Sequence, residues 1–173
     1  MNIFYVDEDP KLAAQALVDT HVVKMILESA QLLSTAHRVL DGKVTFHGMN
    51  RRLALPDPLL DATLYKEAYV NHPCAVWVRK SVGNYDWLLL HFTWLCGEYT
   101  YRFGRVHKCE ELHPCLSALP RNLPIINVVL PVAQAMPAEY RNHGSAVENY
   151  RAYYREGKKH LHKWTKRTKP GWL

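Results

Sequence analysis

The sequence lacks any long hydrophobic run. Its apolar stretches, such as Trp87–Leu90, are far shorter than the about 20 residues that a helix needs to cross a bilayer. The first residues contain neither the basic region nor the apolar region of a signal peptide, so we expect none. These absences argue against a membrane partner and lead us to expect a cytoplasmic protein.

Several catalytic motifs are absent as well. The chain has no glycine-rich phosphate loop, no nucleophile elbow and no zinc-protease motif, so serine or cysteine nucleophile chemistry has no support. Its four cysteines are expected to be reduced thiols, because no secretory signal accompanies them. The segment HKCEELHPC (107–115) holds four groups that bind zinc, but its spacing matches no specific zinc motif and equally fits packed histidines and free thiols. We therefore expect no metal and no other cofactor.

Acidic residues are scarce in the C-terminal segment, which we define as residues 151–173. This segment has eight Lys or Arg and one acid, whereas the first 150 residues have 14 basic and 15 acidic residues. The cations are interleaved with tyrosine and tryptophan, a composition that suits a phosphate backbone and unstacked bases. The alternative is a solvated basic tail that serves solubility. On the first interpretation the partner is DNA or a nucleotide, and the contacts are Lys163, Trp164, Lys166, Arg167 and Trp172.

The sequence pattern predicts an all-α protein, a compact single domain over residues 1–173 with long irregular connections. Start and stop signals, including Pro10 at a helix start and Gly42 and Gly104 just past helix ends, give the boundaries. Three main helices are predicted over 19–41, 74–103 and 144–163, with shorter ones over 10–18 and 60–70. Residues 43–60 are predicted to form a loop, and only 125–130 have the character of a strand.

One line of polar residues runs along the otherwise apolar helix over 19–41. Its members are three and four residues apart and so project from one side: His21, Lys24, Glu28, Gln31, Thr35 and Arg38. Unpaired buried polar groups cost about 1–3 kcal/mol each, so such a line is kept where it is paired or used. An ion pair between Lys24 and Glu28 on a wet face is one interpretation. The other is a cleft, in which Glu28 is a general acid or electrostatic stabiliser and His21 orients it or contacts a phosphate.

The predicted helix over 74–103 has a polar line of its own, made of Trp77, Ser81, Asn84, His91, Glu98 and Arg102. If the two polar lines faced each other, their side chains could pair and neither line would be left against apolar residues. We therefore predict a cleft between the two helices, in which Glu28 lies close to His21, Asn84 or His91. Gln31 and Arg38 extend this cleft as substrate-contacting residues.

Four blocks of the sequence occur in an order that is found in a known enzyme family. They are DTHVVKMILE with RVLDGK (19–28 and 38–43), NHPCAVW with SVGNYDWLLLHFTWLCGEYTYRFG (71–104), MPAEYR (136–141) and KWTKRTKPGW (163–172). Together they resemble the phage pyrimidine-dimer DNA glycosylases, the endonuclease V type with AP-lyase activity. In this resemblance Asp19, His21 and Glu28 fall where the family has Asp-x-His and its catalytic Glu.

The resemblance implies a compact helical fold and glycosylase and lyase chemistry. In the family the N-terminal α-amine attacks the sugar C1′, and the helix Glu, here Glu28, stabilises the cationic sugar and assists the lyase step. Family members expose the amine of a small residue after Met removal. Here residue 2 is Asn, a poor substrate for that removal, so Met1 is expected to supply the amine. Lys24, one turn from Glu28, is a second amine whose alternative role is a plain ion pair.

The chain departs from the family where arginines hold the DNA backbone. The family has arginines directly before its Glu and three residues after it, where this sequence has Leu27 and Gln31. The fold and Glu28 are kept despite these departures. From the resemblance we predict a DNA N-glycosylase or AP lyase that acts on damaged or modified pyrimidine nucleotides through an amine and Glu28. The alternatives are a non-catalytic nucleic-acid or nucleotide-binding protein on the same fold, and a structural or regulatory adaptor.

Overall fold

The structure is a computed structural model that describes residues 1–142 and 144–173. Two antiparallel strands, β1 (Lys43–His47) and β2 (Asn50–Ala54), form a hairpin. The α-helices are α1 (Pro10–Ala16), α2 (Asp19–Asp41), α3 (Pro58–Thr63), α4 (Pro73–Val78), α5 (Val82–Phe103), α6 (His113–Leu116) and α7 (Ala146–Gly157). Short 3-10 turns are η1 (Lys108–Leu112), η2 (Ala138–Tyr140) and η3 (Lys159–Leu161). The prediction of a helical fold is confirmed, in the form of a mostly helical protein with one small hairpin.

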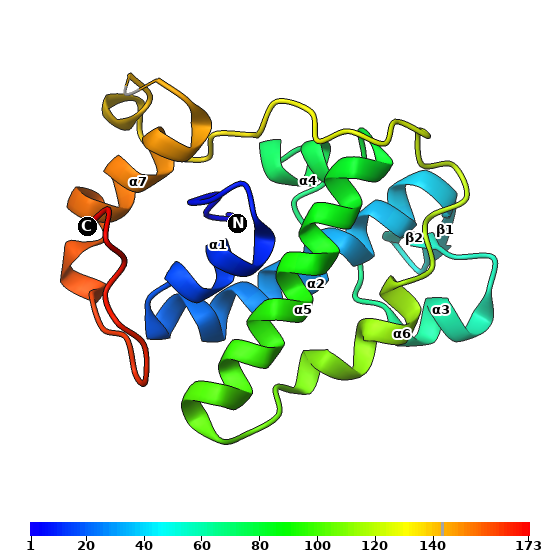
Figure 1. Ribbon diagram of the computed structural model, residues 1–173. Helices are drawn as coiled ribbons and strands as arrows, with labels where there is room; N and C mark the ends of the chain where they lie inside the picture. Colours follow the sequence, from blue (N-terminus) through cyan, green and yellow to red (C-terminus); the bar gives the residue numbers. More distant parts are fainter. Residues whose placement is uncertain (143) are drawn as a thin grey trace.

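The two longest helices, α2 and α5, pack against each other at the centre of the molecule (Figure 1). α1 packs on α5 and leads directly into α2. Local signals explain α1, because Pro10 opens it and the Asp9 side chain accepts hydrogen bonds from the backbone N–H groups of Lys11 and Leu12. α2 ends at Asp41 before Gly42, and α5 ends at Phe103 before the left-handed Gly104, as predicted.

The N-terminal segment, residues 2–6, is part of the core. Ile3 and Val6 are fully buried, and Phe4 and Tyr5 nearly so. Phe4 stacks on His21 of α2 with ring centroids 4.3 Å apart, and Tyr5 packs on Trp87 of α5 at 4.4 Å. The segment thus contacts both long helices, and this arrangement brings the start of the chain to the polar side of α2.

The prediction of a loop over 43–60 is wrong, because the hairpin occupies most of this range and α3 begins at Pro58. Val44, Thr45 and Phe46 supply the β-branched and aromatic residues that strands favour, and Gly48 takes a positive φ of 61° in the turn. The base of the hairpin is held by side chains from elsewhere in the chain, which a local reading cannot reveal. Leu53 donates its backbone N–H to Glu67, and Arg52 pairs with Asp61.

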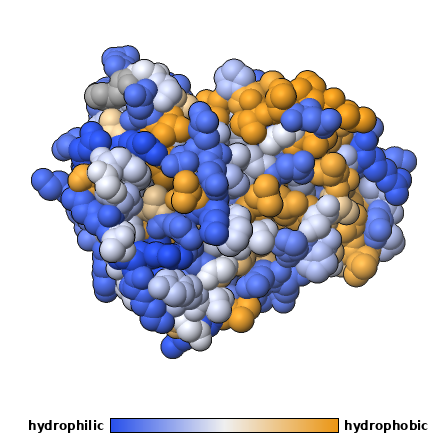
Figure 2. All heavy atoms as spheres, viewed as in Figure 1, coloured by the Kyte–Doolittle hydropathy of each residue, from blue (hydrophilic) through white to orange (hydrophobic). Residues whose placement is uncertain are grey.

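The single helix predicted over 74–103 is in fact two helices, α4 and α5. Ser81 caps α5 by accepting a hydrogen bond from the Asn84 N–H, and the N–H groups of Val82 and Gly83 donate to carbonyls of Pro124 and Ile126. The segment 124–131 therefore lies along the start of α5 as extended chain rather than as the predicted strand. It leaves Ile125 and Val128 exposed, and Figure 2 shows an apolar area where this segment crosses the molecule.

Two other helix predictions are shorter in the structure. The helix expected over 60–70 ends at Thr63, and the one expected over 144–163 ends at Gly157, followed by η3. α7 begins with a complete capping box between Ser145 and Glu148, which explains why its start is well marked in the sequence. Among the helices that the structure describes, none is long and apolar enough to span a membrane.

Candidate active site

The site centres on Glu28, which projects from the middle of α2. Its carboxylate is largely shielded from solvent, with 12% of the side chain exposed. Oε2 accepts a hydrogen bond of 2.8 Å from the backbone nitrogen of Asn2, and Oε1 lies 3.5 Å from the Lys24 ammonium. The carboxylate therefore lies beside the Asn2 backbone and a lysine amine at the same place, whereas the catalytic roles of Glu28, Met1 and Lys24 stay predictions.

Asn2 is held rigidly by its own side chain. Its amide donates to the carbonyl of Ala135 at 2.7 Å, and its side-chain oxygen accepts from the N–H groups of Ile3 and Phe4 at 2.8 and 3.0 Å. Phe4 adopts a positive φ of 46°, an unfavourable conformation for a bulky residue that its packed surroundings must maintain. The sequence reasoning missed Asn2, because its role depends on a carbonyl 133 residues away.

His72 and Cys74 complete the electrostatic surroundings. Burial lowers the pKa of His72, the N-terminal ammonium lowers it further, and Glu28 opposes both. Burial raises the pKa of the Cys74 thiol to about 12, an effect that the N-terminal ammonium reduces and Glu28 increases. The charges of the terminal amine and of the Glu28 carboxylate therefore both affect the pKa values of His72 and Cys74. His72 also caps α4 by accepting a hydrogen bond from the Cys74 N–H at 3.2 Å.

His21 lies on the same side of α2 but serves another contact. Its Nδ1 lies 2.7 Å from the Tyr154 hydroxyl, and its ring is covered by Phe4. Burial lowers its pKa to about 4, assisted by the charges of Lys158, Lys24 and His160, so the ring is neutral near pH 7. His21 thus positions the N-terminal segment and α7, and no hydrogen bond joins it to Glu28 among the described residues.

The C-terminal half of the polar line is covered by the chain rather than open. Thr35 exchanges hydrogen bonds with the backbone of Ala68, at 3.4 Å as donor and 3.1 Å as acceptor. Arg38, predicted to contact substrate, is 1% exposed, pairs with Asp61 and donates to four backbone carbonyls between Leu53 and Tyr65. It therefore anchors the segment 53–65. Gln31, between Glu28 and Thr35, is half-buried and stays a predicted substrate contact.

The predicted pairing of the two polar lines does not occur, because the N-terminal segment takes the place beside Glu28. Asn84 is buried, donates to the Trp77 carbonyl and accepts from the Leu130 N–H at 2.7 Å each, so it fixes the segment 124–131. His91 is fully buried, stacks on Trp87 at 5.0 Å and has no hydrogen-bond partner among the described residues. Neither residue is brought to Glu28.

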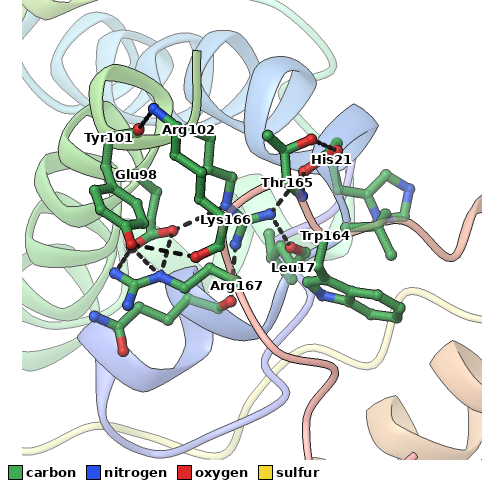
Figure 3. A network of polar contacts seen from close by, with 12 residues as sticks. Leu17, His21, Glu98, Tyr101, Arg102, Trp164, Thr165, Lys166 and Arg167 are labelled. Carbon is green, nitrogen blue, oxygen red and sulfur yellow. Dashed lines mark hydrogen bonds and ion pairs between the residues drawn. The ribbon is translucent and has the colours of Figure 1, made fainter. Parts of the chain in front are cut away.

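The other end of the α5 line forms a charged network with the C-terminal segment (Figure 3). Arg102 donates to Glu98 at 3.0 Å and to Asp19 at 3.1 Å, and Arg167 binds Glu98 through Nε and Nη2. Thr165 donates its N–H and its hydroxyl to Asp19. Burial alone would raise the pKa of Asp19, but the hydrogen bonds from Thr165 and Arg102 outweigh burial and hold it below its usual value.

The other predicted DNA contacts in the C-terminal segment are also engaged in folding. Trp164 donates to the Ala16 carbonyl, the Lys166 ammonium donates to the Tyr101 carbonyl, and Trp172 lies under Arg151. The Lys163 carbonyl accepts a hydrogen bond from the Asp19 N–H at the start of α2, while the Lys163 side chain is exposed. The segment is therefore docked along the start of α2 and the end of α5, not a free basic tail.

The region HKCEELHPC is packed rather than arranged around a metal. His113 lies 3.0 Å from the Thr93 hydroxyl, and Cys109 lies 3.3 Å from the Tyr65 hydroxyl. Within residues 1–142 and 144–173, no three His, Cys, Asp or Glu side chains come together in a way that would hold a metal ion. All four cysteines are free thiols.

Comparison with known proteins identifies the family. A family model described as pyrimidine dimer DNA glycosylase matches residues 1–111, which include the N-terminal segment, Glu28 and all of α5. No curated protein and no solved structure matches the chain. The matched range covers the first two resemblance blocks and leaves out MPAEYR and the C-terminal segment, whose likeness stays a prediction. Because the match spans well over half of the 173 residues, the chain belongs to the pyrimidine dimer DNA glycosylase family.

Proposed function

We propose that this protein is a DNA N-glycosylase and AP lyase that acts on damaged or modified pyrimidine nucleotides through an N-terminal amine and Glu28. The observation that carries the proposal is the 2.8 Å contact between the Asn2 nitrogen and the Glu28 carboxylate. With Met1 present this nitrogen is an amide, and removal of Met1 would make it a primary amine. An amine beside a shielded carboxylate is the pair of groups that imine chemistry at a sugar requires. Family membership supplies DNA as the substrate.

The first step is displacement at the sugar. The neutral amine attacks C1′ as the bond between C1′ and the base breaks, and the base leaves with the electron pair. Positive charge develops on the sugar in this oxocarbenium-like state, and the carboxylate of Glu28 stabilises it electrostatically. Chain-terminal amines have lower pKa values than lysine amines, so a larger neutral fraction is ready to attack near neutral pH.

The second step is strand cleavage. The amine now bonded to C1′ loses a proton as the sugar ring opens, which gives an imine between the nitrogen and C1′. Removal of a proton from C2′ then expels the 3′ phosphate by β-elimination. Glu28 is the carboxylate next to the nitrogen, so we assign it the acceptor role in these proton transfers. Hydrolysis of the imine releases the sugar and restores the amine.

Three nitrogens compete for the nucleophilic role. The sequence favours the Met1 amine, because Asn is a poor second residue for Met removal. The geometry favours the Asn2 nitrogen, which becomes a primary amine 2.8 Å from Glu28 if Met1 is removed. The Lys24 ammonium is 3.5 Å from the same carboxylate, but 67% of its side chain is exposed. We therefore rank Asn2 first, Met1 second and Lys24 third.

Borohydride trapping tests the proposal. The protein is incubated with duplexes that carry an abasic site or ultraviolet dimers, the imine is reduced, and the adduct is mapped by peptide mass spectrometry. We expect an adduct on the first residue of the mature chain, with Lys24→Met trapping normally. Glu28→Gln should lower the trapping rate by a factor of about 10²–10³ while DNA binding is retained. Glu156→Gln, which changes an exposed acid on α7, is the control.

The outcomes separate the alternatives. An adduct on Lys24, lost in Lys24→Met and insensitive to N-terminal acetylation, moves the nucleophile to α2. Full activity in both the acetylated protein and Glu28→Gln refutes the glycosylase mechanism. Binding without any trapped adduct on abasic, dimer or modified-base DNA identifies a non-catalytic nucleic-acid-binding protein.

A further inference from the structure

The hairpin carries cations that no acidic side chain neutralises. Lys43, Arg51 and Lys66 are exposed and form no ion pair with any described residue. Lys66 follows α3 and lies next to Glu67, which binds the backbone of β2. We call Phe46, Met49, Arg51, Lys66 and Tyr69 the hairpin surface.

A hollow of about 240 Å³ lies between the hairpin and the segment after α3. Asn50, Arg51, Arg52, Lys66 and Glu67 line it, so three cations face one carboxylate. Glu67 uses one oxygen for the Leu53 N–H, and Arg52 uses its Nη2 for Asp61. The Arg52 Nε and the Glu67 Oε2 are both buried and have no hydrogen-bond partner among the described residues. Excess positive charge with an unsatisfied donor suits a phosphate group.

The end of the hairpin exposes apolar side chains beside these cations. Phe46 is 69% exposed and Met49, in the turn, is 98% exposed. Phe46 pairs directly with Arg51 across the strands, so the ring and the guanidinium lie on the same face of the hairpin. A protruding apolar tip with adjacent cations is a combination by which proteins enter a DNA groove and press against base steps.

The segment that connects the hairpin to His72 runs along the side of α2 that contains Glu28. Arg38 and Thr35, on the Glu28 side of α2, hold the segment that connects the hairpin to His72. Tyr69 lies on that segment, is 73% exposed and adopts a positive φ of 47°. From Glu28 to the end of α2 the helix rises about 20 Å, or about six base pairs of duplex. In Figure 1 the hairpin lies beside the last turns of α2.

We infer that the hairpin surface binds the DNA duplex on one side of the lesion, with Arg51 and Lys66 on the phosphates and Phe46 and Met49 in the groove. The inference rests on the proposed function for the identity of the ligand. On this inference the duplex contact lies about six base pairs from the reacting sugar, on the hairpin rather than on α2 or α5.

The test is the salt dependence of binding to an undamaged 20-base-pair duplex, measured by fluorescence anisotropy. Each phosphate contact contributes about −0.9 to the slope of log affinity against log salt, so Arg51→Glu/Lys66→Glu should reduce the slope by about 2. Arg105→Glu/Lys108→Glu, exposed cations just beyond the end of α5, makes the same change in net charge and should leave most of the slope. Arg51→Gln/Lys66→Gln repeats the test with a milder change should the Glu variant fold poorly.

The apolar tip has a separate signature. Phe46→Ser/Met49→Ser should weaken binding about fivefold or more without a change in slope, because contacts between rings and bases are independent of salt. An unchanged slope in both hairpin charge variants, an equal loss in the Arg105/Lys108 control, or wild-type protein that does not bind the duplex would overturn the inference. Borohydride trapping at saturating protein separates this result from the chemistry. If the hairpin charge variants reduce the slope but wild-type protein gives no trapped adduct, the proposed function is refuted. The inference that the hairpin surface binds duplex DNA still holds in that case.

Discussion

The C-terminal segment and the hairpin surface are both basic and aromatic, but their cations are used differently. In the C-terminal segment Arg151 pairs with Asp7 and Arg167 with Glu98, while Arg155 and Lys166 donate to carbonyls. In the hairpin surface Arg51 and Lys66 lack an acidic partner among the described residues. Counting charges along the chain therefore locates basic segments, but only the partners of each charge show which segment can still bind phosphate.

The physical reason lies in desolvation. A cation that is bound to a carboxylate in the protein has already exchanged water for that partner, and it must lose the partner before it can contact DNA. An exposed, unpaired cation releases a condensed counterion from DNA at no such cost. The C-terminal segment still exposes Lys159, Lys163 and Lys169, so it adds to the positive field even though its arginines are engaged.

The largest effect should come from removing the shared acid of the C-terminal network. Glu98 is 4% exposed and binds both Arg102 and Arg167. Glu98→Gln leaves Arg102 with Asp19 and leaves Arg167 without an acidic partner among the described residues, so it should lower the free energy of unfolding by about 3–5 kcal/mol in urea denaturation. Glu156→Gln, an exposed acid of α7, is the control. A loss below 1 kcal/mol would show that the network does not hold the segment.

Acidic pH is expected to destabilise the protein through the buried histidines of its core. Burial lowers the pKa of His21 and His37 to about 4 and of His91 to about 3, against about 6.5 in the unfolded chain. The unfolded state therefore binds protons first, so stability is complete above pH 6.5 and falls towards pH 4 by up to about 1.4 kcal/mol per pH unit for each histidine. Asp19 and Asp61 have lowered pKa values, so their contribution is lost only below about pH 4.

His91 allows this prediction to be tested at one residue. Its ring has no hydrogen-bond partner in the described chain, so His91→Leu should cost little at pH 7 and remove the contribution of one histidine to the pH dependence between 6.5 and 4. Unfolding is followed by circular dichroism at several pH values. His160→Leu replaces an exposed histidine whose charge is the smallest of the causes that lower the His21 pKa, so it should keep most of the wild-type slope. A wild-type slope in His91→Leu would show that another group takes up the proton.

The parts of the fold that the sequence predicted correctly depend on local signals. Pro10 and Gly42 sit beside the ends of α1 and α2, so their effects are visible within a few residues. The hairpin and the break before α5 depend instead on distant partners, Glu67 for Leu53 and the Pro124 carbonyl for Val82. No pattern within 43–60 or 74–103 contains those partners.

The site shows the same division. Glu28 is predictable as a candidate because it stands on a regular polar line and matches a family motif, and its catalytic role stays a prediction. Arg38 and Asn84 stand on equally regular lines, yet carbonyls and amides far along the chain satisfy them and remove them from the site. Asn2 was missed for the opposite reason, because its anchor at Ala135 gives it a place that its sequence neighbours do not suggest.

Arg167→Met sharpens the comparison between the two basic regions. Methionine retains the aliphatic stem but removes the bonds to Glu98, which should lower stability by about 1–3 kcal/mol. The slope of DNA affinity against salt should stay that of wild type, the reverse of the result expected for Arg51 and Lys66. Lys163→Met, at an exposed lysine, is the matched control for stability. A reduced salt slope in Arg167→Met would show that this arginine leaves Glu98 to bind phosphate.

The smallest effect concerns Tyr69, where the backbone is unfavourable and the ring is exposed. A left-handed conformation costs an ordinary residue about 1–2 kcal/mol, and glycine avoids that cost while losing about 0.5–1 kcal/mol more entropy on folding. Tyr69→Gly should therefore raise the free energy of unfolding by about 0.5–1 kcal/mol, whereas Tyr69→Ala, which keeps the unfavourable φ of 47°, should not. If the ring stacks on DNA, both variants lose affinity equally and Tyr69→Phe keeps it, as anisotropy would show. Unchanged affinity in Tyr69→Gly would remove Tyr69 from the hairpin surface and leave its backbone strain without a binding role.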